Sequence, residues 1–243
     1  MYEKLKERFT SGVFKGEKTK ERAFEKAYAD MSRRATGHKA SMKTACMQWL
    51  EENRVFEKVL TCTTQEDFDR WHREACEKLK EIHGNFGRIG RSQKVINMAF
   101  KYLSCIDNTY DSVLPFCHMT LDGYTLNWYK EIGGEWVEWS KIDDYDEYFN
   151  IQEDIRNHLQ NNTEYSITIN KKATKTIPLS NLPFKAEFIV WEGEIIKSKY
   201  NNIIKDLVNY KNKGKEKDKW LIDDMFDCYL QDYSKLLICD KKK

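Results

Sequence analysis

The spacing of apolar residues between Thr64 and Gly84 constrains the fold more than any other feature of the sequence. Five apolar side chains recur there at intervals of three or four residues: Phe68, Trp71, Ala75, Leu79 and Ile82. Such spacing puts them on one face of an α-helix, and Thr64 followed by Asp67 is typical of a capped helix start. Similar spacing recurs along a chain of 243 residues that contains only 3 prolines. The sequence therefore predicts a mainly α-helical, multi-helix globular fold.

Helical spacing and turn residues also predict the order of the other elements. We expect further helices at 18–34, 39–60, 92–103, 122–131, 144–159 and 183–210. Strand-like residues after position 164 predict a small β-hairpin near 165–178. The predicted divisions are an N-terminal helical region (1–62), a central helical domain with a hairpin-like loop at 84–94 (63–212), and a linker with a C-terminal helix (213–243).

Several features predict a cytoplasmic protein that does not span a membrane. The first eight residues lack the apolar stretch of a signal peptide, and no apolar run approaches the roughly 18 residues of a spanning helix. The 7 cysteines include no C-x-x-C pair, which favours reduced thiols over a disulfide framework or a zinc site. We expect neither a metal nor a cofactor.

The net charge of +2 conceals a strong segregation of charge. Residues 1–45 carry twelve Lys and Arg against six Asp and Glu, and no acid lies between Glu81 and Asp107. From 107 to 160 the balance reverses, with twelve acids against three bases. This pattern predicts either a basic face for phosphates or ion pairing between the two regions.

A glycine-punctuated basic loop precedes the helix that we expect to begin at Ser92, its predicted N-cap. Exposed backbone amides and the positive end of the helix favour a phosphate there. The predicted DNA-binding residues are Gly87, Arg88, Gly90, Arg91, Ser92, Lys94 and Lys101. An ordinary helix–helix turn is an alternative explanation of the glycines, and solvated surface charge is an alternative explanation of the two lysines.

Two short segments of the chain match a known pattern. They are Gly87-Arg88-Ile89-Gly90-Arg91-Ser92-Gln93-Lys94 and Leu121-Asp122-Gly123-Tyr124. Together they resemble the hairpin and the catalytic-aspartate segment of the helix-hairpin-helix DNA glycosylases. The resemblance implies that the hairpin grips DNA, and that Asp122 stabilises the cationic sugar formed as a base leaves or orients the attacking water. Ser92 stands where bifunctional members carry a nucleophilic lysine, so the resemblance implies a monofunctional glycosylase or an inactive DNA-binding relative.

Three residues are candidates for catalysis, namely Asp122, His118 and Lys94. His118 is a candidate general base beside Asp122, because its ordinary pKa suits proton transfer. A helix N-cap is the plainer explanation of Asp122. The patterns Gln93-Lys94-x-x-Asn97-x-x-x-Lys101 and His118-x-x-x-Asp122 also resemble uncharacterised bacterial and phage proteins, which implies no activity.

Two other classes of function fit the sequence. A non-enzymatic protein-binding factor, associated with phage or with defence, would use the acidic aromatic region 131–160 and would expose a large apolar patch. A small-molecule or nucleotide enzyme would use His118 and Asp122 in a closed pocket. DNA is the partner that we expect first, and a protein the second.

Overall fold

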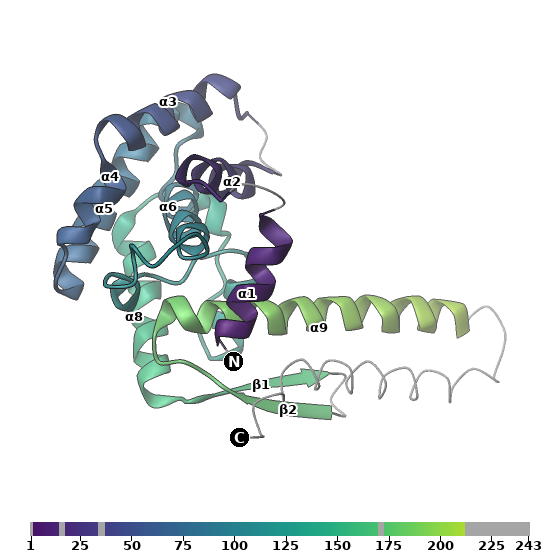
Figure 1. Ribbon diagram of the computed structural model, residues 1–243. Coiled ribbons are helices and arrows are strands. Elements are labelled where there is room, and N and C mark those ends of the chain that lie inside the picture. Colours follow the sequence, from purple (N-terminus) through teal and green to yellow (C-terminus); the bar gives the residue numbers. More distant parts are fainter. Residues whose placement is uncertain (1, 15–17, 34–36, 170–172, 212–243) are drawn as a thin grey trace.

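The computed structural model of the protein describes residues 2–14, 18–33, 37–169 and 173–211. It is mainly α-helical with one two-stranded sheet, as the sequence predicts (Figure 1). The helices are α1 (Tyr2–Val13), α2 (Lys20–Ser32), α3 (Ala40–Glu52), α4 (Val55–Lys58), α5 (Gln65–His83), α6 (Ile89–Leu103), α7 (Gly123–Glu131), α8 (Tyr145–Asn161) and α9 (Pro183–Lys211). Short 3₁₀ turns lie at Val59–Thr61 (η1), Gly84–Phe86 (η2), Leu114–Phe116 (η3) and Trp139–Lys141 (η4).

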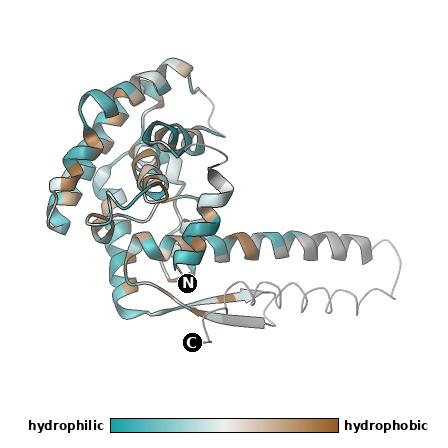
Figure 2. Ribbon diagram, viewed as in Figure 1, coloured by the Kyte–Doolittle hydropathy of each residue, from teal (hydrophilic) through white to brown (hydrophobic). Residues whose placement is uncertain are grey.

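The helix α6 lies at the centre of the fold. Of its 15 residues, 13 are buried, and α2 and α5 pack against it. Figure 2 shows the apolar residues that gather on it. Polar side chains on α6 therefore face other protein groups instead of water; they are Ser92, Gln93, Asn97 and Lys101.

An extended segment, residues 117–122, runs through the core beside α6. Gln152 donates to the carbonyl of Met119 over 2.9 Å and accepts from its amide over 3.0 Å. Gln93 likewise donates to the carbonyl of Leu121 over 2.9 Å and accepts from its amide over 3.2 Å. Two buried glutamine side chains thus supply the hydrogen bonds that neighbouring strands would supply in a sheet, because buried backbone groups must be paired.

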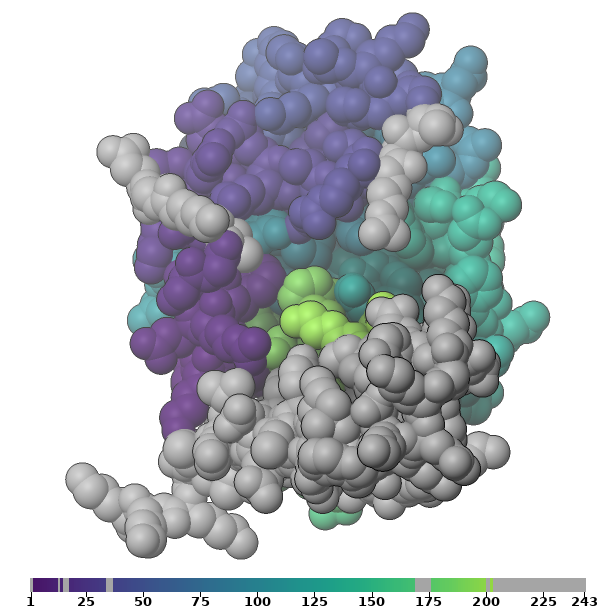
Figure 3. Space-filling view, turned by 90° about the vertical axis from the view of Figure 1, so that its right-hand side faces the viewer, coloured from purple at the N-terminus to yellow at the C-terminus, as the bar shows by residue number. Residues whose placement is uncertain are grey.

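The hairpin and α9 form the second part of the structure. Strand β1 (Glu164–Ile169) pairs antiparallel with β2 (Ala173–Pro178), and Glu164 lies opposite Pro178. In Figure 1 both strands run beside α9, which extends beyond the other helices. Figure 3 shows α1, in purple, and the teal middle of the chain on opposite sides of the α9 atoms. None of the helices in the described ranges is both long and apolar enough to cross a bilayer.

Several predicted helix boundaries are wrong, and each error has a physical reason. The helix expected over 39–60 ends at Glu52, because Arg54 adopts a left-handed conformation with φ of 50° before α4 begins. The helix expected to start at Ser92 begins a turn earlier, with Arg88 as its N-cap. Helix α1 lies within the predicted N-terminal helical region (1–62), but no separate helix is predicted at its position. The predicted linker and C-terminal helix, 213–243, lie outside the described residues.

The N-terminal and central regions share one hydrophobic core. The core contains residues from α2 and α3 together with residues from α5, α6 and α9. Helix α2 packs mainly on α6, so the residues before 62 and after 63 form one packed body.

Candidate functional site

A cavity of about 940 Å³ opens at the start of α6. Its walls come from four separate stretches: 37–42, the end of α5 with η2, the first turn of α6, and 140–143. Four cations line it, Lys39, Arg88, Arg91 and Lys141, and Asp143 is the acid among its lining residues. We call this cavity the α6 pocket. It is the place where the predicted basic loop meets the surface.

The two glycines of the basic loop permit close backbone contacts around the α6 pocket. A Cβ atom on Gly90 would lie 1.6 Å from the carbonyl oxygen of Trp139, and one on Gly87 would lie 2.0 Å from the carbonyl oxygen of Lys80. The Gly90 amide donates to the carbonyl of Ile142 over 2.9 Å. The glycines therefore pack η4 and α5 against the start of α6, and the amide of Gly90 is already paired within the protein.

Two arginines give the α6 pocket its charge. One guanidinium N–H of Arg88 donates to the carbonyl of Gly87, and one of Arg91 donates to the carbonyl of Phe86. The Arg91 guanidinium also stacks over the Phe86 ring, 4.0 Å from its centroid. Burial, and then repulsion from Arg88, lowers the pKa of Arg91, whereas Glu138 raises it. Neither arginine forms an ion pair with any residue that the structure describes.

The other charges around the α6 pocket largely cancel. The Asp143 carboxylate lies 2.7 Å from Lys80. The Lys141 ammonium lies 2.8 Å from Glu138, in a pair that is well exposed and therefore weak. When these pairs are set aside, the two arginines and Lys39 are the lining cations that have no carboxylate partner among the residues the structure describes.

Asp122 and Lys94 meet, but neither lines the α6 pocket. The Lys94 ammonium lies 3.6 Å from Asp122 Oδ2 and 4.5 Å from the centroid of the Trp139 ring. Asp122 Oδ1 accepts from the amides of Tyr124 and Thr125 over 2.9 and 3.2 Å, which caps α7. The N-cap explanation of Asp122 is thus confirmed, and its carboxylate is already engaged by three partners.

Two other predicted DNA-binding residues are buried. Ser92 is fully buried in the first turn of α6. The Lys101 side chain is 1% exposed and forms an ion pair of 2.8 Å with Glu187, whose side chain is 3% exposed. Three aromatic rings surround its ammonium: Phe9, Phe188 and Trp191. The expectation that Lys101 is a solvated surface charge is therefore wrong, because its partner comes from α9.

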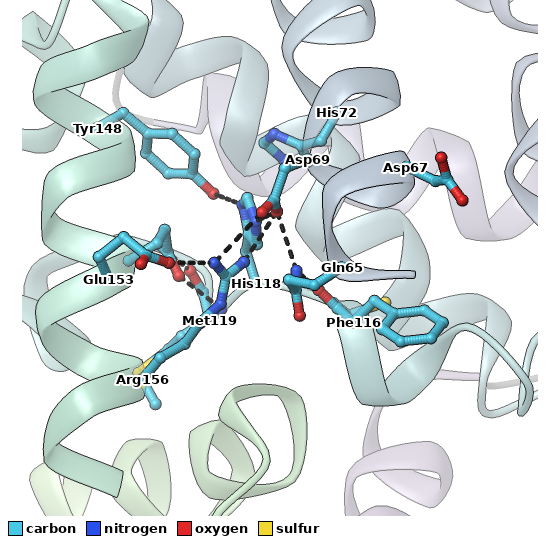
Figure 4. Close-up of polar contacts among 12 residues, drawn as sticks. Gln65, Asp67, Asp69, His72, Phe116, His118, Met119, Tyr148, Glu153 and Arg156 are labelled. Carbon is cyan, nitrogen blue, oxygen red and sulfur yellow. Dashed lines mark hydrogen bonds and ion pairs between the residues drawn. The ribbon is translucent and has the colours of Figure 1, made fainter. Parts of the chain in front are cut away.

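His118 belongs to a separate polar cluster between α5 and α8 (Figure 4). Its Nε2–H donates to Asp69 Oδ1 over 2.6 Å, and its Nδ1 accepts from the Tyr148 hydroxyl over 2.7 Å. Arg156 lies 2.9 Å from the same Asp69 oxygen. Among the described residues, the polar partners of His118 are thus Asp69 and Tyr148 and not Asp122, beside which we expect it from the sequence.

Burial and ion pairing together set the charge states in this cluster, and burial dominates at His118. It lowers the pKa of His118 to about 4, against the opposing hydrogen bond to Asp69. Burial also raises the pKa of Asp69, but the hydrogen bond from His118 and the Arg156 charge outweigh it and bring the value to about 2. At neutral pH the histidine is therefore a neutral hydrogen-bond donor to a carboxylate. Its side chain is fully buried, so no substrate in solvent can reach it.

The acidic aromatic region 131–160 turns most of its rings inward. Tyr145 and Tyr148 are buried, and Trp139 is partly buried. Across the described parts of the chain, the exposed large apolar side chains are Leu60 and Trp136. Leu60 lies in η1 and Trp136 in the loop before η4, so the large apolar patch expected of a protein-binding surface is not formed by these two residues.

Several residues of the α6 pocket and of the polar cluster around His118 are not predicted from the sequence. Lys39 and Lys141 reach the α6 pocket from segments that lie far from Arg88 in sequence, and no local pattern marks them. Asp69 and Arg156 occupy amphipathic helices where a charged residue is unremarkable. Among the described residues, no group of three or more His, Cys, Asp or Glu side chains is placed to hold a metal ion.

Comparison with known proteins adds no assignment. No protein-family model matches the sequence, and no curated protein or solved structure matches it significantly. The fold and the α6 pocket thus define a mainly α-helical protein with a basic surface cavity.

Proposed function

We propose that this protein binds nucleic acid, and DNA in particular, through phosphate contacts at the α6 pocket. The observation that carries the proposal is the pair of arginines, Arg88 and Arg91, which line one cavity without a carboxylate partner in the described chain. Guanidinium groups offer planar forks of donors that match phosphate oxygens. The carbonyls that each arginine already contacts hold these forks in place and leave other N–H groups for a ligand.

The surrounding charge supports a phosphate polymer as the ligand. The sequence from 82 to 106 contains no acid, and residues 1–45 have a twofold excess of bases over acids. Part of this second basic region, Lys39, reaches the α6 pocket. A basic cavity raises the local concentration of polyanions and speeds their association.

The proposal stops at binding and does not include cleavage of a glycosidic bond. A glycosylase would need the Asp122 carboxylate to face a sugar. Asp122 instead caps α7 and lies against Lys94, outside the lining of the α6 pocket.

Anisotropy of a labelled DNA duplex, measured with wild type and with Arg88→Gln, tests this proposal. Loss of a charge-assisted contact of about 1.5–3 kcal/mol should weaken binding by roughly ten- to a hundredfold. The matched control is Arg70→Gln, which removes the same charge from an exposed arginine of α5 that pairs with Asp67. The control should bind within about twofold of wild type. No binding at low salt, or equal weakening in both variants, would refute the proposal.

A further inference from the structure

We infer that the α6 pocket takes a terminal phosphomonoester, as found at a strand end, in preference to a phosphodiester within a strand. This inference rests on the proposed nucleic-acid binding and specifies which phosphate the site selects. It follows from three properties of the α6 pocket: the number of uncompensated cations, the concave shape, and the absence of an open aromatic face.

The charge of the site matches a doubly charged anion. Arg88 and Arg91 line the same cavity, and the positive charge of Arg88 contributes to the lowered pKa of Arg91. Neither arginine forms an ion pair with a described residue. A phosphodiester brings one negative charge, whereas a phosphomonoester brings about −1.5 to −2 at neutral pH. Two neighbouring guanidinium groups neutralise the second kind of phosphate more completely. Lys39, which lines the same cavity, adds a third cation.

The shape of the site favours the end of a strand. The cavity of about 940 Å³ lies between the end of α5, the start of α6 and the 140–143 stretch. That volume is in the range of sites that enclose small molecules, roughly 300–1,000 Å³. A terminal nucleotide can enter such a space with its phosphate first. The backbone of an uninterrupted duplex continues in both directions, so it would have to lie across the opening.

The aromatic side chains of the site are already occupied. Phe86 is 5% exposed, the Arg91 guanidinium lies over its ring, and the ring makes T-shaped contacts with His38 and His83. No other phenylalanine, tyrosine or tryptophan of the described ranges lines the cavity. A base therefore has no ring there to stack on, although stacking is the usual source of single-strand affinity. The selection is thus made by the phosphate, and binding should not depend on the terminal base.

The test compares one hairpin oligonucleotide in forms that differ only at the ends. They carry a 5′-phosphate, a 3′-phosphate or hydroxyl groups alone, and a covalently closed dumbbell of the same duplex has no end. We expect at least one phosphorylated form to bind about fivefold or more tightly than the hydroxyl form and the dumbbell. Arg88→Gln should abolish the difference, and Arg70→Gln should keep it.

Two further measurements ask whether the bound phosphate belongs to a strand end or to a small molecule, and whether the variants remain folded. Competition by a free 5′-mononucleotide distinguishes a strand end from a small molecule. A mononucleotide that binds as tightly as the phosphorylated hairpin would overturn the strand-end assignment, and one that binds at least tenfold more weakly would support it. Arg91→Lys keeps the charge and loses the planar fork, so it should reduce the preference for the phosphorylated hairpin. Arg88→Gln should unfold at the wild-type temperature, which would show that its loss of preference does not come from a loss of fold.

The two proposals fail in different ways. Equal affinity for phosphorylated, unphosphorylated and closed forms would overturn the strand-end inference and leave DNA binding intact. Absence of binding to every form at low salt would overturn DNA binding itself.

Discussion

Replacement of Lys101 by methionine should destabilise the protein strongly, because the Glu187 carboxylate would remain in the core without its cation. The ammonium lies 2.8 Å from Glu187 Oε1. It also lies 4.7 and 4.8 Å from the ring centroids of Phe188 and Trp191. Both charged side chains are almost fully shielded from solvent. Methionine fills much of the lysine volume, so the lost charge should dominate the effect.

The size of the effect follows from what is left behind. Removal of one partner from a buried ion pair typically costs about 3–5 kcal/mol, since the other charge stays desolvated. For a chain of this size, about 1 kcal/mol corresponds to roughly 2–4 °C in Tm. The Lys101→Met variant should therefore melt about 6–20 °C below wild type.

A double variant, Lys101→Met with Glu187→Gln, should recover most of that loss. Glu187 Oε2 accepts from the amide of Thr120 over 2.8 Å, and a glutamine oxygen can accept the same bond. The double variant removes both charges and leaves the backbone bond in place. Exchange of a whole buried pair for neutral groups of similar volume is often close to neutral.

Urea unfolding followed by circular dichroism at neutral pH measures all four members of this cycle. The reasoning requires a coupling of at least about 2 kcal/mol between the two positions. A Lys101→Met variant within about 1 kcal/mol of wild type, or a double variant whose loss equals the sum of the single losses, would refute it.

Three further predictions concern other parts of the fold. Gly90→Ala would place a Cβ 1.6 Å from the Trp139 carbonyl oxygen. It should cost about 2 kcal/mol or more in urea unfolding, whereas Gly123→Ala, with nothing within 4 Å of the new Cβ, should be close to neutral. Asp122→Asn keeps a capping oxygen and loses only the ion pair with Lys94. Asp122→Ala loses the cap as well and should therefore lose about 0.5–2 kcal/mol more in thermal unfolding; equal losses in the two variants would argue against the cap. Burial lowers the pKa of His118 to about 4 in the folded protein, whereas in the unfolded chain the histidine has its ordinary pKa of about 6.5. The unfolded chain therefore takes up the proton first, and the urea midpoint should fall as pH drops from about 6.5 to 4. His118→Gln should make this fall shallower, and an unchanged slope would count against the burial argument.

The sequence predicted features that depend on neighbouring residues. Thr64 accepts from the amide of Asp67 at the start of α5, as its capping pattern implies. Asp144 caps α8 at the boundary that the sequence indicates. The β-hairpin was also found where strand-like residues predicted it. These features are local because a cap or a hairpin requires only residues within a few positions of one another.

Features that depend on distant residues were missed. Lys101 is buried because Glu187 lies 86 positions further along the chain, and the sequence around either residue gives no sign of the other. Gln93 is buried for a similar reason, since it pairs with the backbone of Leu121. The glycine spacing predicts that Gly90 belongs to a phosphate-binding loop. In the structure its lack of a side chain instead allows the Trp139 carbonyl to pack against it. Local sequence patterns and helix propensities therefore cannot predict which distant residue such a side chain will contact.

A crystal structure with a short 5′-phosphorylated oligonucleotide tests the central claim most directly, because it locates the bound phosphate. The account predicts a phosphate within hydrogen-bond distance, about 2.7–2.9 Å, of guanidinium nitrogens of both Arg88 and Arg91. An oligonucleotide bound only to other surfaces, with both guanidinium groups free of phosphate, would contradict it.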